Sequence, residues 1–453
     1  MEASLELRRR VGLLGATSLV VGGTVGVGIF LTPAGMARGL ASPALVLAVW
    51  LVMGAAAVCG ALSFGELAAR FPQAGGGYVY LREAFGPGTA FLYGWKCLLV
   101  MDPGLTAALA TGAAAYAAAA FPALPPLPTA LGAIALGAFS NAAGVRRAAS
   151  VGQALAVAKV ALLVLLVGWT FFSGAGLAAN LLPFAARPAG APPLLPALAG
   201  ALVAAFFSFG GWWEAAKLAG EVSDAGRVLP RALALGTTAI TLAYVAVSAA
   251  FMALVPVQAV SSPETFVAQA GTVLLGPAGG RVLSLVVALF VLGSLFAFMT
   301  FAPRVYYAMG RDGACPAFVG RLDPRTGAPL RAIALQASLA ALLVVIGSFQ
   351  TIVSYFVFVT MAFLALTVAG LYRLPPPSPG RYRVPGWPLT PLAFLVLLLA
   401  TMALVAAGSP RQALLGSLVV AAGIPVYWLT RARGGPHRRA AAADGTWAPM
   451  EKS

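Results

Sequence analysis

Long apolar runs with few charges constrain this chain more than any other feature. Inside lipid, a backbone satisfies its hydrogen bonds only in a helix or a closed barrel. Barrel strands alternate polar and apolar residues, whereas these runs are continuously apolar and rich in Ala and Leu. The sequence therefore predicts an all-α integral membrane protein with twelve transmembrane helices. The runs of membrane length are 11–36, 43–67, 86–118, 127–145, 150–173, 194–219, 231–255, 280–308, 330–347, 351–372, 389–407 and 411–430.

Composition supports the membrane class. Of 453 residues, 60% are hydrophobic and 9% are charged, against about 25% charged in soluble proteins. Cys59, Cys97 and Cys315 form neither a CxxC pair nor an even-numbered framework, so we expect buried thiols. The single His437 lies in a polar tail. We therefore expect no metal site and no cofactor.

The positions of the charges predict the topology. Twelve spans place both termini on one side of the membrane. Basic residues are few on the far side, where only Arg38, Arg187, Arg281 and Arg411 fall in loops. Lys96 and Lys159 lie within spans, and the other basic residues lie at or near the opposite face. By the positive-inside rule that face is cytoplasmic, so we expect a multi-pass protein of the cell inner (plasma) membrane with both termini inside. Topology thus accounts for the net charge of +16 without a nucleic-acid partner.

No loop between the apolar runs is long enough to form a domain. We expect residues 1–433 to form a single polytopic membrane domain. Residues 434–453 (GGPHRRAAAADGTWAPMEKS) predict a disordered cytoplasmic tail. Residues 372–388 (YRLPPPSPGRYRVPGWP) predict a stiff, extended connector because they are rich in proline.

The first apolar run is interrupted by glycines, in the sequence GGTVGVGIF at residues 22–30. Each glycine costs about 1 kcal/mol in a helix interior relative to Ala. Gly22 and Gly26 could serve close helix packing as a GxxxG pair, whereas a nucleotide loop would need a following Lys-Ser/Thr. The remaining interpretation is an unwound helix that restarts near Gly28. The amides at such a helix start can bind a carboxylate without an arginine.

A second interruption lies five spans later, in FFSFGGWWEAAKLAGEV at residues 206–222. Gly210 and Gly211 divide this membrane span between bulky aromatic residues. One glycine pair would be weak support, since glycines are common in membrane helices. Two interruptions at corresponding places in two five-helix repeats are typical of transporters with inverted repeats.

Several motifs resemble those of the amino acid–polyamine–organocation superfamily, which has the LeuT-like fold. They are GVGIFLTP (26–33), ELAARFPQAGGGYVYLREAFGP (66–87), FSFGGWWE (207–214), RVYYAMGRDG (304–313) and the Pro-rich connector. FGGW and AVAKVALL (156–163) look most like the L-amino acid transporter branch and its bacterial relatives. The resemblance implies two inverted five-helix repeats, two extra helices, and discontinuous helices 1 and 6. Val27, Trp213 and Glu214 depart from the usual pattern of the branch and leave the substrate side chain open.

The resemblance also implies a substrate site at the bilayer midplane, in which backbone groups of both interruptions bind an α-amino acid. Amides of the first interruption would bind the carboxylate, and carbonyls of both would bind the ammonium. Phe207 would be an aromatic lid or, alternatively, a packing residue. The expected substrate-binding residues are Thr24, Gly26, Val27, Gly28, Phe207, Ser208 and Gly210.

Charged residues inside the spans are further candidates. Lys159 lies in mid-span, where a cation costs about 2.5–3.5 kcal/mol. From the resemblance, its ammonium would occupy a cation site between spans one, five and eight, near Gly22 or Gly23, or carry a coupled proton. Asp102 would favour a cationic substrate side chain, pair with another membrane charge, or cap an irregularity at the adjacent proline. Glu214 can pair with Lys217 on one helix face and is a candidate for selectivity or gating.

These features predict a secondary active amino acid transporter that works without sodium, by exchange or proton symport. A small neutral substrate is favoured, and a cationic amino acid or polyamine permease is the alternative. A non-transporting membrane receptor is a different class, but no signalling domain is apparent. An enzyme is disfavoured because HExxH, GxSxG and clustered carboxylates are missing from the sequence. The amino acid, the coupling mode, the direction and the oligomeric state stay open.

Overall fold

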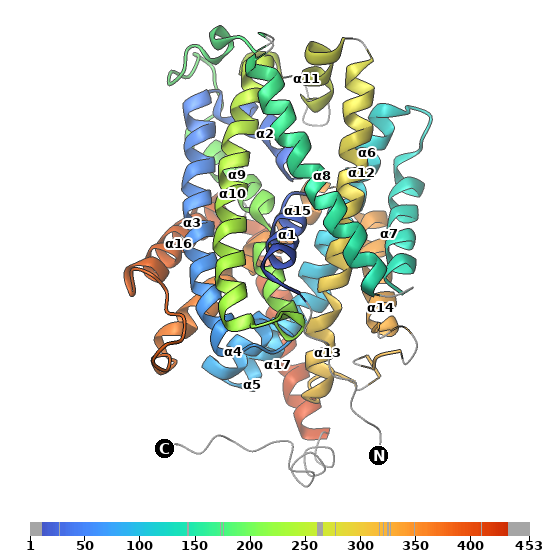
Figure 1. Cartoon of the computed structure of the whole chain (residues 1–453), viewed down its shortest axis with the longest axis vertical. Helices are drawn as coiled ribbons and strands as arrows, with labels where there is room; N and C mark the ends of the chain where they lie inside the picture. Colours follow the sequence, from blue (N-terminus) through green and yellow to red (C-terminus); the bar gives the residue numbers. More distant parts are fainter. Residues whose placement is uncertain are drawn as a thin grey trace.

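The computed structural model describes residues 11–26, 28–142, 145–172, 174, 176–260, 266–276, 278–316, 318–319, 321–323, 326, 328–347, 349–408 and 410–433. Across these residues the secondary structure is helical, apart from one isolated parallel bridge between Val11 and Val222. The long helices run side by side along the long axis of the molecule (Figure 1). The all-α prediction is therefore confirmed for the described residues. The tail 434–453 and Val27 lie outside them.

Helices occupy each of the twelve predicted apolar runs. Continuous apolar sequence forms helices here because a helix satisfies its own backbone polar groups. The principal helices are α1 (Leu13–Thr24), α2 (Gly28–Leu40), α3 (Pro43–Arg70), α5 (Pro87–Lys96), α6 (Asp102–Ala120), α7 (Pro126–Ala142), α8 (Val145–Phe172), α9 (Leu194–Phe209), α10 (Ala225–Leu254), α12 (Gly279–Phe301), α14 (Leu330–Ile346), α15 (Phe349–Ala369), α16 (Leu389–Gly408) and α17 (Pro410–Arg433).

Length and composition divide these helices into two groups. Among the described residues, six segments are long and apolar enough to cross a membrane, or seven if the bent pair α1 and α2 counts as one span. Shorter apolar helices cover 157–172, 330–346, 357–372 and 413–429. The structure is thus that of a polytopic membrane protein, and the number of twelve spans stays a prediction.

Both glycine-rich sequences interrupt their helices, as predicted. α1 ends at Thr24, α2 begins at Gly28, and the two helices are bent by 44°. α9 ends at Phe209, and the chain continues as a 3₁₀ helix, η3 (Trp212–Glu221). Gly211 has φ +129°, a conformation that L side chains rarely adopt. A 3₁₀ run longer than four residues is uncommon and often marks a hinge.

Several short elements fall where the sequence predicts loops or a continuous span. α4 (Gly77–Phe85) and α11 (Phe266–Leu275) lie in predicted loops, because nine or ten residues are too short to read as spans. A π-helical segment, η1 (Cys97–Met101), separates α5 from α6 directly before Asp102. α13 (Pro303–Arg311) follows α12 at a proline.

Ion pairs and hydrogen bonds fix one end of the bundle. Glu66 at the end of α3 pairs with Arg70 and accepts the amide N–H of Val384, with an N···O distance of 2.6 Å. This bond holds the Pro-rich connector against α3. Arg304 of α13 pairs with Glu221 at 3.3 Å, which ties α13 to the end of η3. Cys59, Cys97 and Cys315 are free thiols, but only Cys97 is buried. The prediction of buried thiols is therefore wrong for Cys59 and Cys315, which are partly exposed.

Candidate functional site

The two interruptions lie in direct contact with each other. A Cβ atom added to Gly211 would lie 2.5 Å from the carbonyl oxygen of Gly23, and one added to Gly28 would lie 2.5 Å from Cα of Ser208. Both distances are far below van der Waals contact, so only glycine fits without a backbone shift. The glycines that the sequence identified as helix breakers are therefore also the points at which the two broken helices touch.

The first interruption retains part of its own hydrogen bonding. The amide of Val25 donates to the carbonyl of Val21, and the amide of Gly26 donates to the carbonyl of Thr24 at 2.8 Å. The predicted carboxylate donor Gly26 is thus already engaged in a tight turn. A ligand that takes this amide must replace the bond to Thr24. α2 begins at Gly28. The amides in the first turn of a helix have no carbonyl four residues earlier in the same helix to which they can donate.

Tyr244 of α10 joins the two interruptions. Its hydroxyl lies 3.0 Å from the carbonyl oxygens of both Thr24 and Ser208. One O–H group has a single proton, so the two carbonyls share one donor. Both carbonyls lie where the helices unwind, and the Thr24 carbonyl also accepts the amide of Gly26. In lipid such carbonyls need a partner, and the Tyr244 hydroxyl is a partner common to both. The sequence reasoning missed Tyr244 because it lies inside an uninterrupted apolar run; its only signal is a polar aromatic residue at mid-span.

A hydroxyl pair lies beside this bridge. The oxygens Oγ of Ser208 and Oγ1 of Thr32 are 2.8 Å apart, and the Thr32 hydroxyl donates to the carbonyl of Gly28 at 2.9 Å. Ser208 also bonds the carbonyl of Ala204. Ser208 therefore lies at the contact of α2 with α9, and Thr32 is an additional polar residue there. The substrate-binding role expected for Ser208 stays a prediction.

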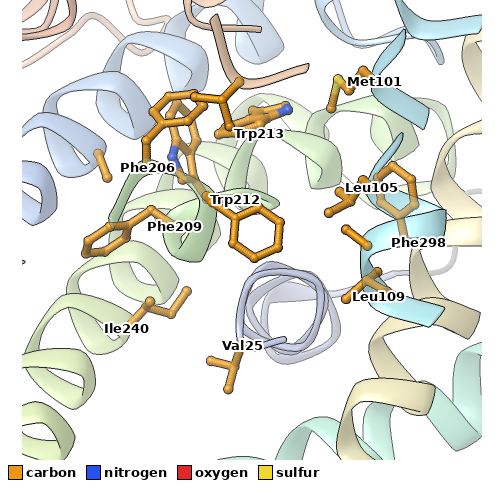
Figure 2. Close-up of a cluster of buried hydrophobic side chains, with 14 of the residues drawn as sticks. Val25, Met101, Leu105, Leu109, Phe206, Phe209, Trp212, Trp213, Ile240 and Phe298 are labelled. Atoms are coloured by element: carbon orange, nitrogen blue, oxygen red, sulfur yellow. The ribbon is translucent and has the colours of Figure 1, made fainter. Parts of the chain in front are cut away.

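The surroundings of the interruptions are apolar and aromatic. Phe207 is buried with 5% exposure, and its carbonyl accepts the amide of Gly210 at 3.0 Å. Figure 2 shows aromatic residues of α9 and η3 on one side of Val25 and apolar residues of η1, α6 and α12 on the other. The labelled residues on these two sides are Phe206, Phe209, Trp212, Trp213, Met101, Leu105, Leu109 and Phe298.

The side chain of Lys159, on the neighbouring helix α8, reaches the first interruption. Its side chain is 1% exposed, and its Nζ lies 3.4 Å from the carbonyl oxygen of Gly22 and contacts Oγ of Ser294. Ser294 of α12 also lies 3.1 Å from the carbonyl of Val25. The Nζ of Lys159 thus lies between α1, α8 and α12, next to Gly22. The sequence reasoning missed Ser294, a small polar residue in an apolar helix.

Asp102 belongs to a buried cluster of four charges. The Nζ of Lys217 lies 3.6 Å from Oδ1 of Asp102 and 2.6 Å from Oε2 of Glu214. The hydroxyl of Tyr306 donates to Oδ2 of Asp102 at an O···O distance of 2.8 Å. Lys96 lies nearby without an ion pair in the described part of the chain; its Nζ contacts the Met101 sulfur and the Tyr93 ring. Of the sequence alternatives for Asp102, pairing with another membrane charge is what the structure contains.

Two broken helices in contact, with backbone polar groups converging inside an apolar bundle, are the architecture of a membrane transporter. The comparison with known families agrees. Residues 11–429 match the family described as amino acid permease. The chain belongs to this family of transporters, and it is a multi-pass membrane protein and not an enzyme.

Individual relatives extend over most of the chain. The human cystine/glutamate transporter is 27% identical over 441 residues, which covers 94% of this chain and 86% of the relative. The human Asc-type amino acid transporter 1 is 26% identical, with 94% and 83% covered. The mouse b(0,+)-type amino acid transporter 1 is 27% identical, with 81% and 76% covered.

Proposed function

We propose that this protein is a sodium-independent exchanger of small neutral amino acids. The observation that carries the proposal is the buried Nζ of Lys159 beside the unwound end of α1. It satisfies the carbonyl of Gly22 at 3.4 Å and contacts Ser294, which in turn bonds Val25. A fixed cation at this point supplies the charge that a sodium ion would otherwise bring to these oxygens.

The substrate site would be formed by backbone groups of both interruptions. First-turn amides of α2 at Gly28 suit a carboxylate, and the carbonyls of Thr24 and Ser208 suit an ammonium. Tyr244 bridges those two carbonyls, so we infer that substrate binding displaces or shares its hydroxyl. Val27, Phe207 and Gly210 complete the proposed site as the resemblance implies.

The pairing of Asp102 with groups of the protein favours a substrate with a neutral side chain. This carboxylate already faces Lys217 and Tyr306, and the cluster of Lys96, Asp102, Glu214 and Lys217 contains two positive and two negative groups. A cationic substrate would find no unpaired acid there. The apolar lining seen in Figure 2 supports the same choice. A cationic amino acid or polyamine permease is the alternative that transport assays distinguish.

The wider architecture is part of the proposal. Interruptions in the first and sixth predicted spans support the LeuT-like arrangement of two inverted five-helix repeats with two extra helices. The distribution of arginines supports cytoplasmic termini in the inner (plasma) membrane. The names of the relatives, among them a cystine/glutamate transporter and an Asc-type amino acid transporter, support amino acids as the substrates.

Transport by purified protein in liposomes tests the proposal. Vesicles loaded with an unlabelled neutral amino acid should take up the labelled one when choline replaces sodium. Empty vesicles should take up little, because exchange needs a substrate on both sides. Uptake that requires sodium would contradict the role of Lys159. Accumulation driven by a pH gradient into empty vesicles would identify proton symport instead, and uptake of decarboxylated amines alone would contradict the carboxylate site.

A further inference from the structure

A cavity lies at one end of the bundle, where α3 ends and α10 begins. Its volume is about 610 Å³, within the range of small-molecule sites. Three segments line it: the end of α3 with the following loop, the first turns of α10, and the Pro-rich connector. The transport site uses none of these lining residues.

The charged lining of this cavity is predominantly positive. Arg227, Arg231 and Arg381 line it, with Asp224 as the acidic member. Arg227 and Asp224 approach each other only to 3.8 Å, and their side chains are 80% and 61% exposed. Arg231 and Arg381 have no carboxylate within ion-pair distance among the described residues. Two guanidinium groups from different segments are therefore available to one anion, and guanidinium matches phosphate geometry well.

Tyr382 adds a hydrogen-bond donor to this lining. Its hydroxyl is buried and has no hydrogen-bond partner in the part of the chain that the structure describes. Burial and the nearby carboxylate of Glu66 raise the pKa of Tyr382 to about 12, so the phenol keeps its proton at neutral pH. A protonated phenol beside arginines donates to an anionic oxygen and does not repel it.

The surface next to the cavity is apolar and exposed. Leu235 follows Arg231 by four residues and Leu242 by eleven, so all three share one face of α10. The two leucines are 57% and 66% exposed. A basic cavity at the end of a helix, with an exposed apolar surface beside it, matches a molecule that has an anionic head and a hydrocarbon tail.

We propose that this cavity binds the phosphate headgroup of an anionic phospholipid, whose acyl chain lies along α10 at Leu235 and Leu242. Basic pockets between helices on the cytoplasmic side are suited to such headgroups, and the charge distribution of the chain predicts that this end is cytoplasmic. The bound phosphate would link the connector to α10 through Arg381 and Arg231. Lipid binding therefore stabilises the fold at the helix that follows η3.

Lipid binding to the full chain in a neutral detergent tests this inference. The probes are phosphatidylglycerol, phosphatidylcholine with the same acyl chains, and soluble glycerol phosphate, measured by native mass spectrometry and by the shift in thermal unfolding. The test variant is Arg231→Gln with Arg381→Gln. The matched control is Arg281→Gln at the start of α12, an exposed arginine that precedes the exposed Leu285 by one turn but does not line this cavity.

We expect wild-type protein and the control to prefer phosphatidylglycerol over phosphatidylcholine. The double variant should bind phosphatidylglycerol about 30-fold more weakly, because each arginine near an anionic membrane surface contributes about fivefold to the affinity. If it does not fold, the two single variants should each lose about fivefold. Unchanged lipid preference in the double variant would overturn the site. If glycerol phosphate stabilises the protein as much as the lipid does, the cavity is a site for soluble anions, and the assignment of a lipid ligand is wrong.

Discussion

Replacement of Gly28 by Ala tests how closely the two broken helices approach each other. The added Cβ would lie 2.5 Å from Cα of Ser208 and 2.9 Å from its Cβ, whereas packed carbon atoms are about 3.5–4.0 Å apart. α2 and α9 must therefore separate by about 1 Å at this point. An extra methyl in a packed interior costs about 1–3 kcal/mol, and the better helix propensity of Ala offsets about 1 kcal/mol.

We thus expect the free energy of unfolding of Gly28→Ala to fall by up to about 2 kcal/mol. The matched control is Gly35→Ala in the same helix, where an added Cβ meets no atom within 4 Å. That variant should gain up to about 1 kcal/mol from helix propensity. Unfolding in detergent compares the two variants, and exchange in liposomes should fall only in Gly28→Ala, because the separation moves the carbonyls that Tyr244 bridges.

The reasoning is refuted if Gly28→Ala unfolds at the same or a higher temperature than Gly35→Ala and exchanges amino acids at the wild-type rate. The contact of α2 with α9 would then be loose enough to admit a side chain. Gly28 would be an ordinary small residue of a continuous surface. The proposed carboxylate site at the start of α2 would lose its geometric basis.

Three further predictions follow from the same packing. Lys159→Ala should abolish exchange in liposomes while the protein stays folded, because the carbonyls beside α1 lose their fixed cation. Asp102→Asn should lower the free energy of unfolding by about 3 kcal/mol, because it breaks a buried pair with Lys217 although a second carboxylate remains; neutral amino acid uptake per folded molecule should persist. Gly211→Ala should destabilise by about 2–6 kcal/mol, from a positive φ and a clash with backbone, whereas Gly200→Ala in α9 has open space around its Cβ and should be tolerated.

Distinct results would contradict each of these predictions. Wild-type exchange in Lys159→Ala would make the lysine dispensable, and loss of pH-driven accumulation with exchange intact would make it a proton carrier. Arginine uptake by the wild type that disappears in Asp102→Asn would show that this carboxylate binds a cationic substrate side chain. Equal unfolding temperatures for Gly211→Ala and Gly200→Ala would mean that the contact with α1 yields easily.

Some features were accessible from sequence because they are local. Apolar composition determines helix formation in lipid, where each segment must satisfy its own backbone. Glycine clusters weaken a helix wherever they occur, so the ends of α1 at Thr24 and of α9 at Phe209 lie at those clusters. The restart as a 3₁₀ helix at Trp212 was not predictable, because residue types in this segment do not distinguish i+3 from i+4 bonding.

The candidate site was only partly accessible. The sequence pointed to Lys159 because an isolated charge in an apolar run is costly, and the resemblance pointed to its neighbourhood next to Gly22. Ser294 and Tyr244 carried no comparable signal. Small hydroxyls and single tyrosines are tolerated in membrane helices, so their importance depends on which carbonyl they meet.

The sequence alone determined that this chain is a helical membrane protein with two weakened spans and charges placed at cost inside them. Only the tertiary structure decided which groups meet. It brought Gly28 against Ser208, paired Asp102 with Lys217 from another span, and gathered Arg231 and Arg381 around one cavity. The physical reason is that helix formation in lipid depends on neighbouring residues, whereas a contact between distant segments depends on the packing of the whole bundle.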